Sequence, residues 1–157
     1  MKRILLIEDD GAIAEDISNT LSSSEYKFEY AYSYSSAVGF WKEYNGNFDC
    51  IILDLNINPN GLPDELFDKY FPIQGMAVLL EICKTKINDE TPTENEIKKI
   101  WAKTIVYSGY IEKLKTRKKD FQYYNSLTLI PKTGMSMNEL IKKVENIIKE
   151  KNKNNKL

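Results

Sequence analysis

Short apolar runs alternate along the chain with stretches of helical periodicity. Two of the runs, Ile4–Ile7 and Cys50–Leu53, contain no charged residue. Uninterrupted apolar strands are typical of parallel sheets that helices cover on both faces. We predict strands at Arg3–Ile7, Lys27–Ala31, Asp49–Leu55, Thr104–Tyr107 and Leu127–Ile130.

Between these strands, apolar side chains recur every three or four residues, as they do on one face of a helix. This spacing predicts helices at Gly11–Leu21, Ser33–Tyr44, Gly75–Thr85, Ile111–Lys119 and Ser136–Lys149. The last helix opens with a capping box, Ser136 to Glu139. The alternation predicts an α/β fold, a doubly wound five-stranded parallel sheet with helices on both faces.

Two stretches exceed what five strand–helix units need. Residues 56–74 contain four breakers, too many for one regular element, although Pro63–Phe71 is compatible with a short helix. Residues 88–102 begin with acidic residues and continue with a capping box at Thr93–Glu96, which predicts an extra helix.

We therefore predict a single domain over residues 1–150, with insertions at about 56–74 and 88–102. The remaining segment, 151–157, is rich in lysine and asparagine, and we expect it to be frayed.

Composition excludes several classes of function. The 22 basic and 23 acidic residues give a formal net charge of -1, so we expect no direct contact with nucleic acid. No apolar run approaches the length of a membrane span and the N-terminus has no signal-peptide pattern, so we expect no membrane insertion. Cys50 and Cys83 lie in apolar stretches without metal-ligand spacing, which predicts reduced core residues in a cytoplasmic protein. The absence of histidine excludes histidine-based catalysis and a phosphohistidine on this chain.

Acidic residues follow two of the predicted strands. Glu8-Asp9-Asp10 comes directly after the first, and Asp54 lies at the end of the third. The carboxyl ends of parallel strands border the ligand crevice of such sheets, so up to four carboxylates surround one point. Carboxylates this close need a cation or shared protons, and a hard divalent ion such as Mg²⁺ fits best.

Four of the predicted strands end in polar groups. The first strand is followed by the three acids Glu8-Asp9-Asp10, and the third ends in Asp54. The fourth is followed by the hydroxyl of Ser108, and the fifth by the ammonium of Lys132. This series resembles the receiver domain of two-component response regulators, over about residues 2–150. The resemblance implies a flavodoxin-like sheet of order 2-1-3-4-5.

The resemblance also implies a magnesium site. Glu8 and Asp9 match the acidic pair of receivers, with Asp9 as the direct ligand and Glu8 acting through water. Asp10 falls at a third acidic position that varies among receivers, and it could equally cap the following helix. Asp54 and the backbone carbonyl of Asn56 complete the implied ligands.

By the same resemblance, Asp54 is the phosphoacceptor, Ser108 is the hydroxyl that binds the phosphoryl group, and Lys132 pairs with acceptor and phosphoryl oxygens. The phosphoryl donor would be a sensor histidine kinase or a phosphotransfer protein, and an unidentified output protein would read the signal. The resemblance implies no enzymatic activity beyond Mg²⁺-dependent self-phosphorylation and dephosphorylation at Asp54.

The sequence departs from receivers at two further positions. Thr133 follows the lysine where receivers usually have proline, and Leu129 stands where many have an aromatic that moves on activation. Leu129 and the two insertions favour an alternative function, a receiver-like binding module that phosphorylation does not switch. A third alternative is an aspartyl-phosphate phosphatase of the haloacid-dehalogenase type. That class needs an acid two residues after the nucleophile, where this chain has Asn56, and an amide cannot act as a general acid.

Overall fold

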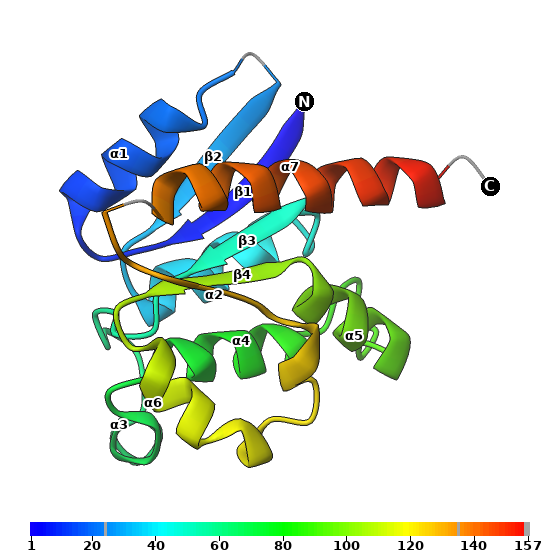
Figure 1. The fold of residues 1–157 in the computed structure, drawn as a ribbon. Helices are drawn as coiled ribbons and strands as arrows, with labels where there is room; N and C mark the ends of the chain where they lie inside the picture. Colours follow the sequence, from blue (N-terminus) through cyan, green and yellow to red (C-terminus); the bar gives the residue numbers. More distant parts are fainter. Residues whose placement is uncertain (24, 135, 156–157) are drawn as a thin grey trace.

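A computed structural model of the chain describes residues 1–23, 25–134 and 136–155. These residues form a five-stranded parallel sheet in the order β2-β1-β3-β4-β5 (Figure 1). The sheet order and the parallel pairing confirm the predicted fold. The strands are β1 Lys2–Ile7, β2 Tyr26–Ala31, β3 Cys50–Leu53, β4 Thr104–Ser108 and β5 Thr128–Pro131.

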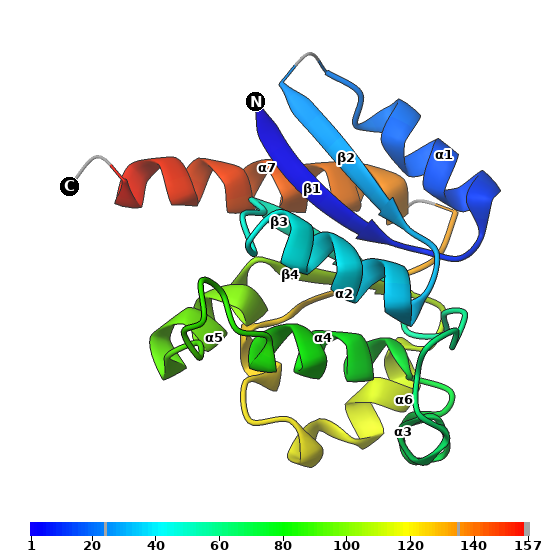
Figure 2. The ribbon, with the colours of Figure 1, turned by 180° about the vertical axis from the view of Figure 1, so that it is seen from behind.

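Helices cover both faces of the sheet. One face carries α1 and α7, which lie towards the reader in Figure 1. The other face carries α2 and α4, which lie towards the reader in the reverse view of Figure 2. All five predicted helices are present, along with one helix in each insertion. The helices are α1 Gly11–Thr20, α2 Tyr34–Glu43, α3 Asp64–Tyr70, α4 Gly75–Lys84, α5 Glu94–Ala102, α6 Ile111–Thr116 and α7 Ser136–Asn154.

Side chains of the central strands alternate between two cores. On β1, Leu5 and Ile7 pack into the core beneath α2 and α4, whereas Ile4 and Leu6 pack into the core beneath α1 and α7. Each of these four side chains is at most 1% exposed, as expected of a strand covered on both faces. This double burial explains why the strands read as continuous apolar runs.

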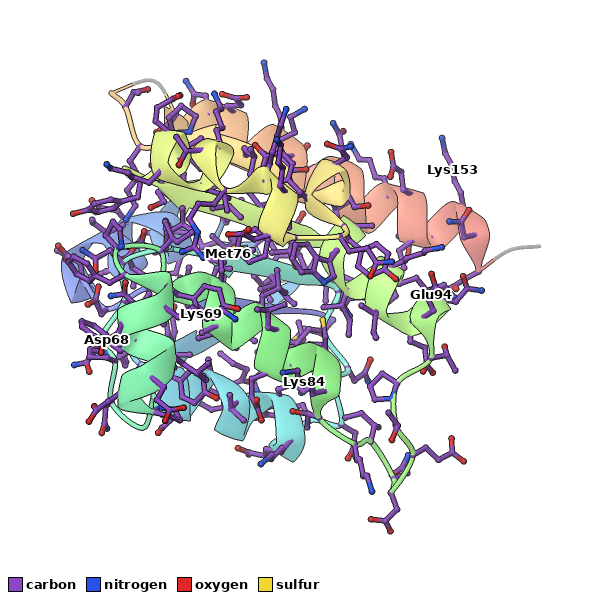
Figure 3. The ribbon with its side chains drawn as sticks, turned by 90° about the horizontal axis from the view of Figure 1, so that it is seen from below. Asp68, Lys69, Met76, Lys84, Glu94 and Lys153 are labelled. Carbon is purple, nitrogen blue, oxygen red and sulfur yellow. The ribbon has the colours of Figure 1, made fainter. Side chains whose placement is uncertain are left out.

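Aromatic side chains link the two insertions to each other through the segment between α6 and β5. Tyr70 of α3 stacks on Phe121 with a centroid distance of 6.2 Å, and Trp101 of α5 lies 6.3 Å from the same ring. Trp101 also contacts Tyr123, so residues of the segment between α6 and β5 join α3 to α5. Figure 3 shows α4 from below, running from Met76 near its start to Lys84 at its end. Most residues of α4 are buried, as in a core helix.

The first insertion also contacts the end of α6. Arg117, directly after α6, donates from Nη1 to the carbonyl of Lys69 in α3 at 2.8 Å. Its guanidinium carbon lies 5.4 Å from the centroid of the Tyr70 ring and its Nε pairs with Asp120 at 2.9 Å. The chain then forms a short 3₁₀ turn at Lys118–Asp120, so α6 ends at Thr116, before the predicted Lys119.

The last helix is longer than the sequence predicted. We expected fraying from residue 151, but α7 continues to Asn154. Lys151 forms an ion pair with Asp49 at 2.8 Å, and Lys2 donates to the side chain of Asn152 at 2.8 Å. These contacts join the end of α7 to the start of the sheet, while residues 156–157 lie outside the described residues. No described helix has the length and apolar character needed to cross a membrane.

Candidate functional site

Three of the predicted acidic residues meet at the carboxyl edge of the sheet. Ile7 and Leu53 are register partners on the neighbouring strands β1 and β3, so the residues that follow them lie side by side. Glu8 and Asp54 are almost completely buried, and Asp9 is exposed. One carboxylate oxygen from each of these three acids lies within 4.8 Å of the others.

Lys132 places its ammonium group between two of the acids. Its Nζ lies 2.6 Å from Oε2 of Glu8 and 3.2 Å from Oδ2 of Asp54. Its backbone N–H donates to the carbonyl of Ser108 at 3.1 Å, which ties the residue after β5 to the end of β4. The structure therefore brings Glu8, Asp54, Ser108 and Lys132 together, as the sequence predicted.

One lysine lies among three carboxylates, and two of these, Glu8 and Asp9, have raised pKa values. Burial, followed by the charge of Asp54, raises the pKa of Glu8 to about 7 in spite of its contact with Lys132. Partial burial and the charge of Asp54 also raise the pKa of Asp9. Burial opposes the charge on Lys132, but its hydrogen bond to Glu8 and the charge of Asp54 outweigh burial and raise its pKa. Burial and mutual repulsion thus oppose the ionisation of Glu8 and Asp9.

The donor set fits Mg²⁺. All three side chains offer carboxylate oxygens, which hard divalent cations prefer, and they converge on one point that reaches solvent through Asp9. A cation there would offset the burial and the charge of Asp54, which together raise the pKa values of Glu8 and Asp9. The residues present therefore match the expected cofactor.

Asp10 lies outside this cluster and caps α1. Its Oδ1 accepts the backbone N–H groups of Ala12 at 3.0 Å and Ile13 at 3.2 Å. Its own N–H donates to Oε1 of Glu8 at 3.1 Å, so it also helps to orient that carboxylate. Of its two predicted roles, the structure shows the helix cap.

Ser108 lies directly beside the central acid. Its side chain is fully buried, and its Oγ accepts the N–H of Tyr110 at 3.1 Å. The N–H of Leu55 points at both groups, at 2.7 Å from Oδ1 of Asp54 and 3.4 Å from Oγ of Ser108. A shared donor thus fixes the hydroxyl next to the carboxylate.

Asn56 is held by two residues that the sequence analysis did not single out. Its Nδ2 donates to the hydroxyl of Tyr110 at 3.2 Å, and its Oδ1 accepts from Nε2 of Gln74 at 2.6 Å. Gln74 is 2% exposed and also donates to the carbonyl of Ile57 at 3.0 Å. The only sequence signal for this link was the place of Gln74 at the end of the first insertion, because nothing local predicts its contact with Asn56.

Gly75, the first residue of α4, permits the close approach of this helix to the site. Its N–H donates to the carbonyl of Leu55 at 2.6 Å. A Cβ atom at this position would collide with the backbone carbonyl oxygen of Asp54. Glycine is therefore required here by space rather than by backbone dihedral angle.

The departures from the receiver pattern have specific structural settings. Leu129 is half-buried on β5 and packs against the core on the α4 side. Thr133 is held by Ser136, whose hydroxyl accepts its N–H at 3.0 Å and donates to its carbonyl at 2.7 Å. Ser136 is the first residue of α7 and its hydroxyl bonds to the preceding loop, whereas the predicted capping box placed it as the N-cap.

No family model matches this chain, and no curated protein matches it either. Solved structures resemble it over nearly its full length. A response regulator receiver domain protein from Clostridium thermocellum has 18% identity and a TM-score of 0.61, over 97% of this chain and 98% of that one. The non-phosphorylated HemR receiver domain from Leptospira biflexa has 22% identity and a TM-score of 0.58, over 94% of each chain.

A third similar structure is the response regulator TrrA from Thermotoga maritima in complex with Mg²⁺ and beryllium fluoride. It has 22% identity and a TM-score of 0.56, over 94% of this chain and 99% of that one. At these identities the likeness concerns the fold.

Proposed function

We propose that this chain, which has the fold of response regulator receiver domains, is a receiver that accepts a phosphoryl group on Asp54 and signals through protein contacts. One observation carries the proposal: Asp54 lies within 4.8 Å of Glu8 and Asp9 at the end of a buried strand, with Lys132 at 3.2 Å. A buried carboxylate beside a cation site and an ammonium group has what phosphoryl transfer requires, a nucleophile and positive charge for the transferred oxygens.

Glu8, Asp9, Asp54 and the backbone carbonyl of Asn56 would hold Mg²⁺. When bound, the ion would neutralise charge on the phosphoryl oxygens. A carboxylate oxygen of Asp54 forms the new bond to phosphorus while the bond between phosphorus and the donor breaks, and the donor keeps that electron pair. The N–H of Leu55 holds Oδ1 of Asp54 at 2.7 Å, which limits rotation of the nucleophile.

Ser108 and Lys132 would bind the transferred group. The Ser108 hydroxyl accepts the N–H of Tyr110, so its own hydrogen can rotate to donate to a phosphoryl oxygen. Lys132 contacts Asp54 already and, as a point charge, can pair with both an acceptor and a phosphoryl oxygen. These two side chains approach Asp54 from β4 and from the loop after β5.

The partners follow from the same chemistry. The chain has no histidine, so a phosphohistidine donor must belong to another protein, a sensor histidine kinase or a phosphotransfer protein. An output protein would then recognise the phosphorylated form. Cys50 and Cys83 are buried and free, which agrees with a reducing, cytoplasmic location.

A receiver-like binding module that does not switch is the second candidate. Two observations favour it: Leu129 replaces the mobile aromatic, and Arg117 ties α6 to the insertion helix α3. The phosphatase has less support, because the side chain of Asn56 is an amide engaged with Gln74 and Tyr110 and supplies no proton.

Crystals soaked with Mg²⁺ and beryllium fluoride test the proposal. We expect density for the ion between Glu8, Asp9 and Asp54, and for beryllium fluoride on an oxygen of Asp54. Binding of both groups elsewhere, or of neither in crystals with an open site, would contradict a receiver function. Amide hydrogen exchange measured with and without Mg²⁺ and beryllium fluoride separates the two candidates. In a non-switching module, the exchange rates would change only beside Ser108.

A further inference from the structure

A buried group of hydrogen bonds lies beneath the loop that carries Lys132. Oγ of Ser136 lies 3.0 Å from the amide nitrogen of Thr133, 2.7 Å from its carbonyl oxygen and 2.9 Å from the hydroxyl of Tyr107. Tyr107 is 6% exposed and Ser136 is 3% exposed. Neither side chain takes part in the proposed phosphoryl transfer.

The directions of these hydrogen bonds follow by elimination. The N–H of Thr133 can only donate, so Oγ of Ser136 accepts from it. The carbonyl of Thr133 can only accept, so the single hydrogen of the Ser136 hydroxyl goes there. Tyr107 must therefore donate its hydroxyl hydrogen to Ser136. Ser136 then accepts two hydrogen bonds and donates one, which uses its full capacity.

This arrangement fixes the backbone on both sides of the Lys132 side chain. The N–H of Lys132 donates to the carbonyl of Ser108 at the end of β4, and the next residue, Thr133, is held at both of its backbone groups by Ser136. The lysine side chain also passes the aromatic ring of Tyr107, with Nζ 5.7 Å from the ring centroid. Tyr107 thus contacts Lys132 directly through its ring and indirectly through Ser136.

We propose that Tyr107 and Ser136 are positioning residues that aim Lys132 at Asp54. Lysine has a long, flexible stem, so its ammonium reaches a defined point only when the backbone and the path of the stem are restrained. Tyr107 restrains the stem and Ser136 restrains the loop. The inference rests on the proposed function, because it assigns two further residues to the same site.

Four variants test this role. Tyr107→Phe keeps the ring and removes the hydroxyl, Ser136→Ala removes the acceptor, and Ser136→Thr retains a hydroxyl. Tyr124→Phe is the matched control, since Tyr124 is a half-buried tyrosine in the 3₁₀ turn before β5, outside this group. Each variant is assayed for three properties: its phosphorylation rate with acetyl phosphate at saturating Mg²⁺, its Mg²⁺ affinity, and amide hydrogen exchange at Lys132 and Thr133.

We expect Tyr107→Phe and Ser136→Ala to lower the phosphorylation rate about tenfold, a common effect of removing a residue that orients a functional group. Their Mg²⁺ affinity should not fall, because neither residue contacts the acidic cluster and a displaced Lys132 would leave Glu8 and Asp54 less neutralised. Exchange at Lys132 and Thr133 should accelerate. Ser136→Thr and the control should behave as wild type.

Two results would overturn the proposal. One is a wild-type rate and unchanged exchange in both Tyr107→Phe and Ser136→Ala. The other is an equal loss of rate and of Mg²⁺ affinity, which would show a general structural role. If the wild-type chain accepts no phosphoryl group at all, the proposed function fails, and exchange at Lys132 and Thr133 still decides whether these residues hold the loop.

Discussion

The affinity of the site for Mg²⁺ should depend on pH through Glu8. Burial and the charge of Asp54 raise the pKa of Glu8 from 4.5 to about 7, against the effect of Lys132. Near pH 6, therefore, only about one tenth of Glu8 is ionised, while near pH 8 about nine tenths is. A cation held by carboxylates must displace that proton, so apparent Mg²⁺ affinity should be about tenfold weaker near pH 6 than near pH 8.

The same proton affects stability in the absence of metal. Because the folded state holds a proton that the unfolded state releases, the free energy of unfolding should fall as the pH rises from about 4.5 to about 7 and then level off. The full change corresponds to about 3 kcal/mol for a group as buried as Glu8. Saturating Mg²⁺ should restore stability above pH 7, since it binds the folded state.

Isothermal titration calorimetry with Mg²⁺ near pH 6 and pH 8 measures this effect. Repeating the titration in buffers with different ionisation enthalpies gives the number of protons released. Glu8→Gln is the matched variant, because it keeps the shape and has no proton to lose. Near pH 8 we expect Glu8→Gln to bind Mg²⁺ more weakly than the wild type. Most of the pH dependence of its Mg²⁺ affinity should be gone, and the remainder should come from Asp9, whose pKa is also raised. Equal affinity of the wild type at both pH values, or a full tenfold dependence in Glu8→Gln, would refute the reasoning.

Three further predictions concern other parts of the site. Asp9→Asn should weaken Mg²⁺ binding more than Asp10→Asn, because Asp10 lies outside the acidic cluster and asparagine still caps α1, and equal losses in a titration would contradict this assignment. Gly75→Ala should destabilise the fold by about 1–3 kcal/mol in chemical denaturation, whereas Gly39→Ala, which meets no atom within 4 Å, should not, and an unchanged midpoint for the first would disprove the steric argument. Arg117→Ala should accelerate amide exchange in α6, and wild-type exchange there would show that α3 does not restrain this helix.

The carboxyl edge of the sheet was predictable because it depends on local sequence. Apolar runs fix where a buried strand ends, so the acids, the hydroxyl and the lysine that follow each run were placed at one edge before any contact was known. The helix in the second insertion was predictable for the same reason. Its capping box is present, with Thr93 and Glu96 bonded reciprocally.

Features that depend on distant partners were not predictable. The extension of α7 relies on Lys151 pairing with Asp49, about a hundred residues earlier in the chain. The hydrogen bonds of Ser136 differ from the prediction because a capping-box pattern does not reveal that the preceding loop and Tyr107 both bond to its hydroxyl. The pattern likewise left both roles of Asp10 open until its bonds to the start of α1 were seen.

Phosphorylation of Asp54 tests the central claim most directly. The wild-type chain and Asp54→Asn are incubated with acetyl phosphate, with Mg²⁺ or with EDTA, and their intact masses are measured. We predict one phosphoryl adduct on the wild type with Mg²⁺, and none with EDTA or on Asp54→Asn. An adduct that persists unchanged in Asp54→Asn, or a wild-type chain that is never modified, would contradict the claim.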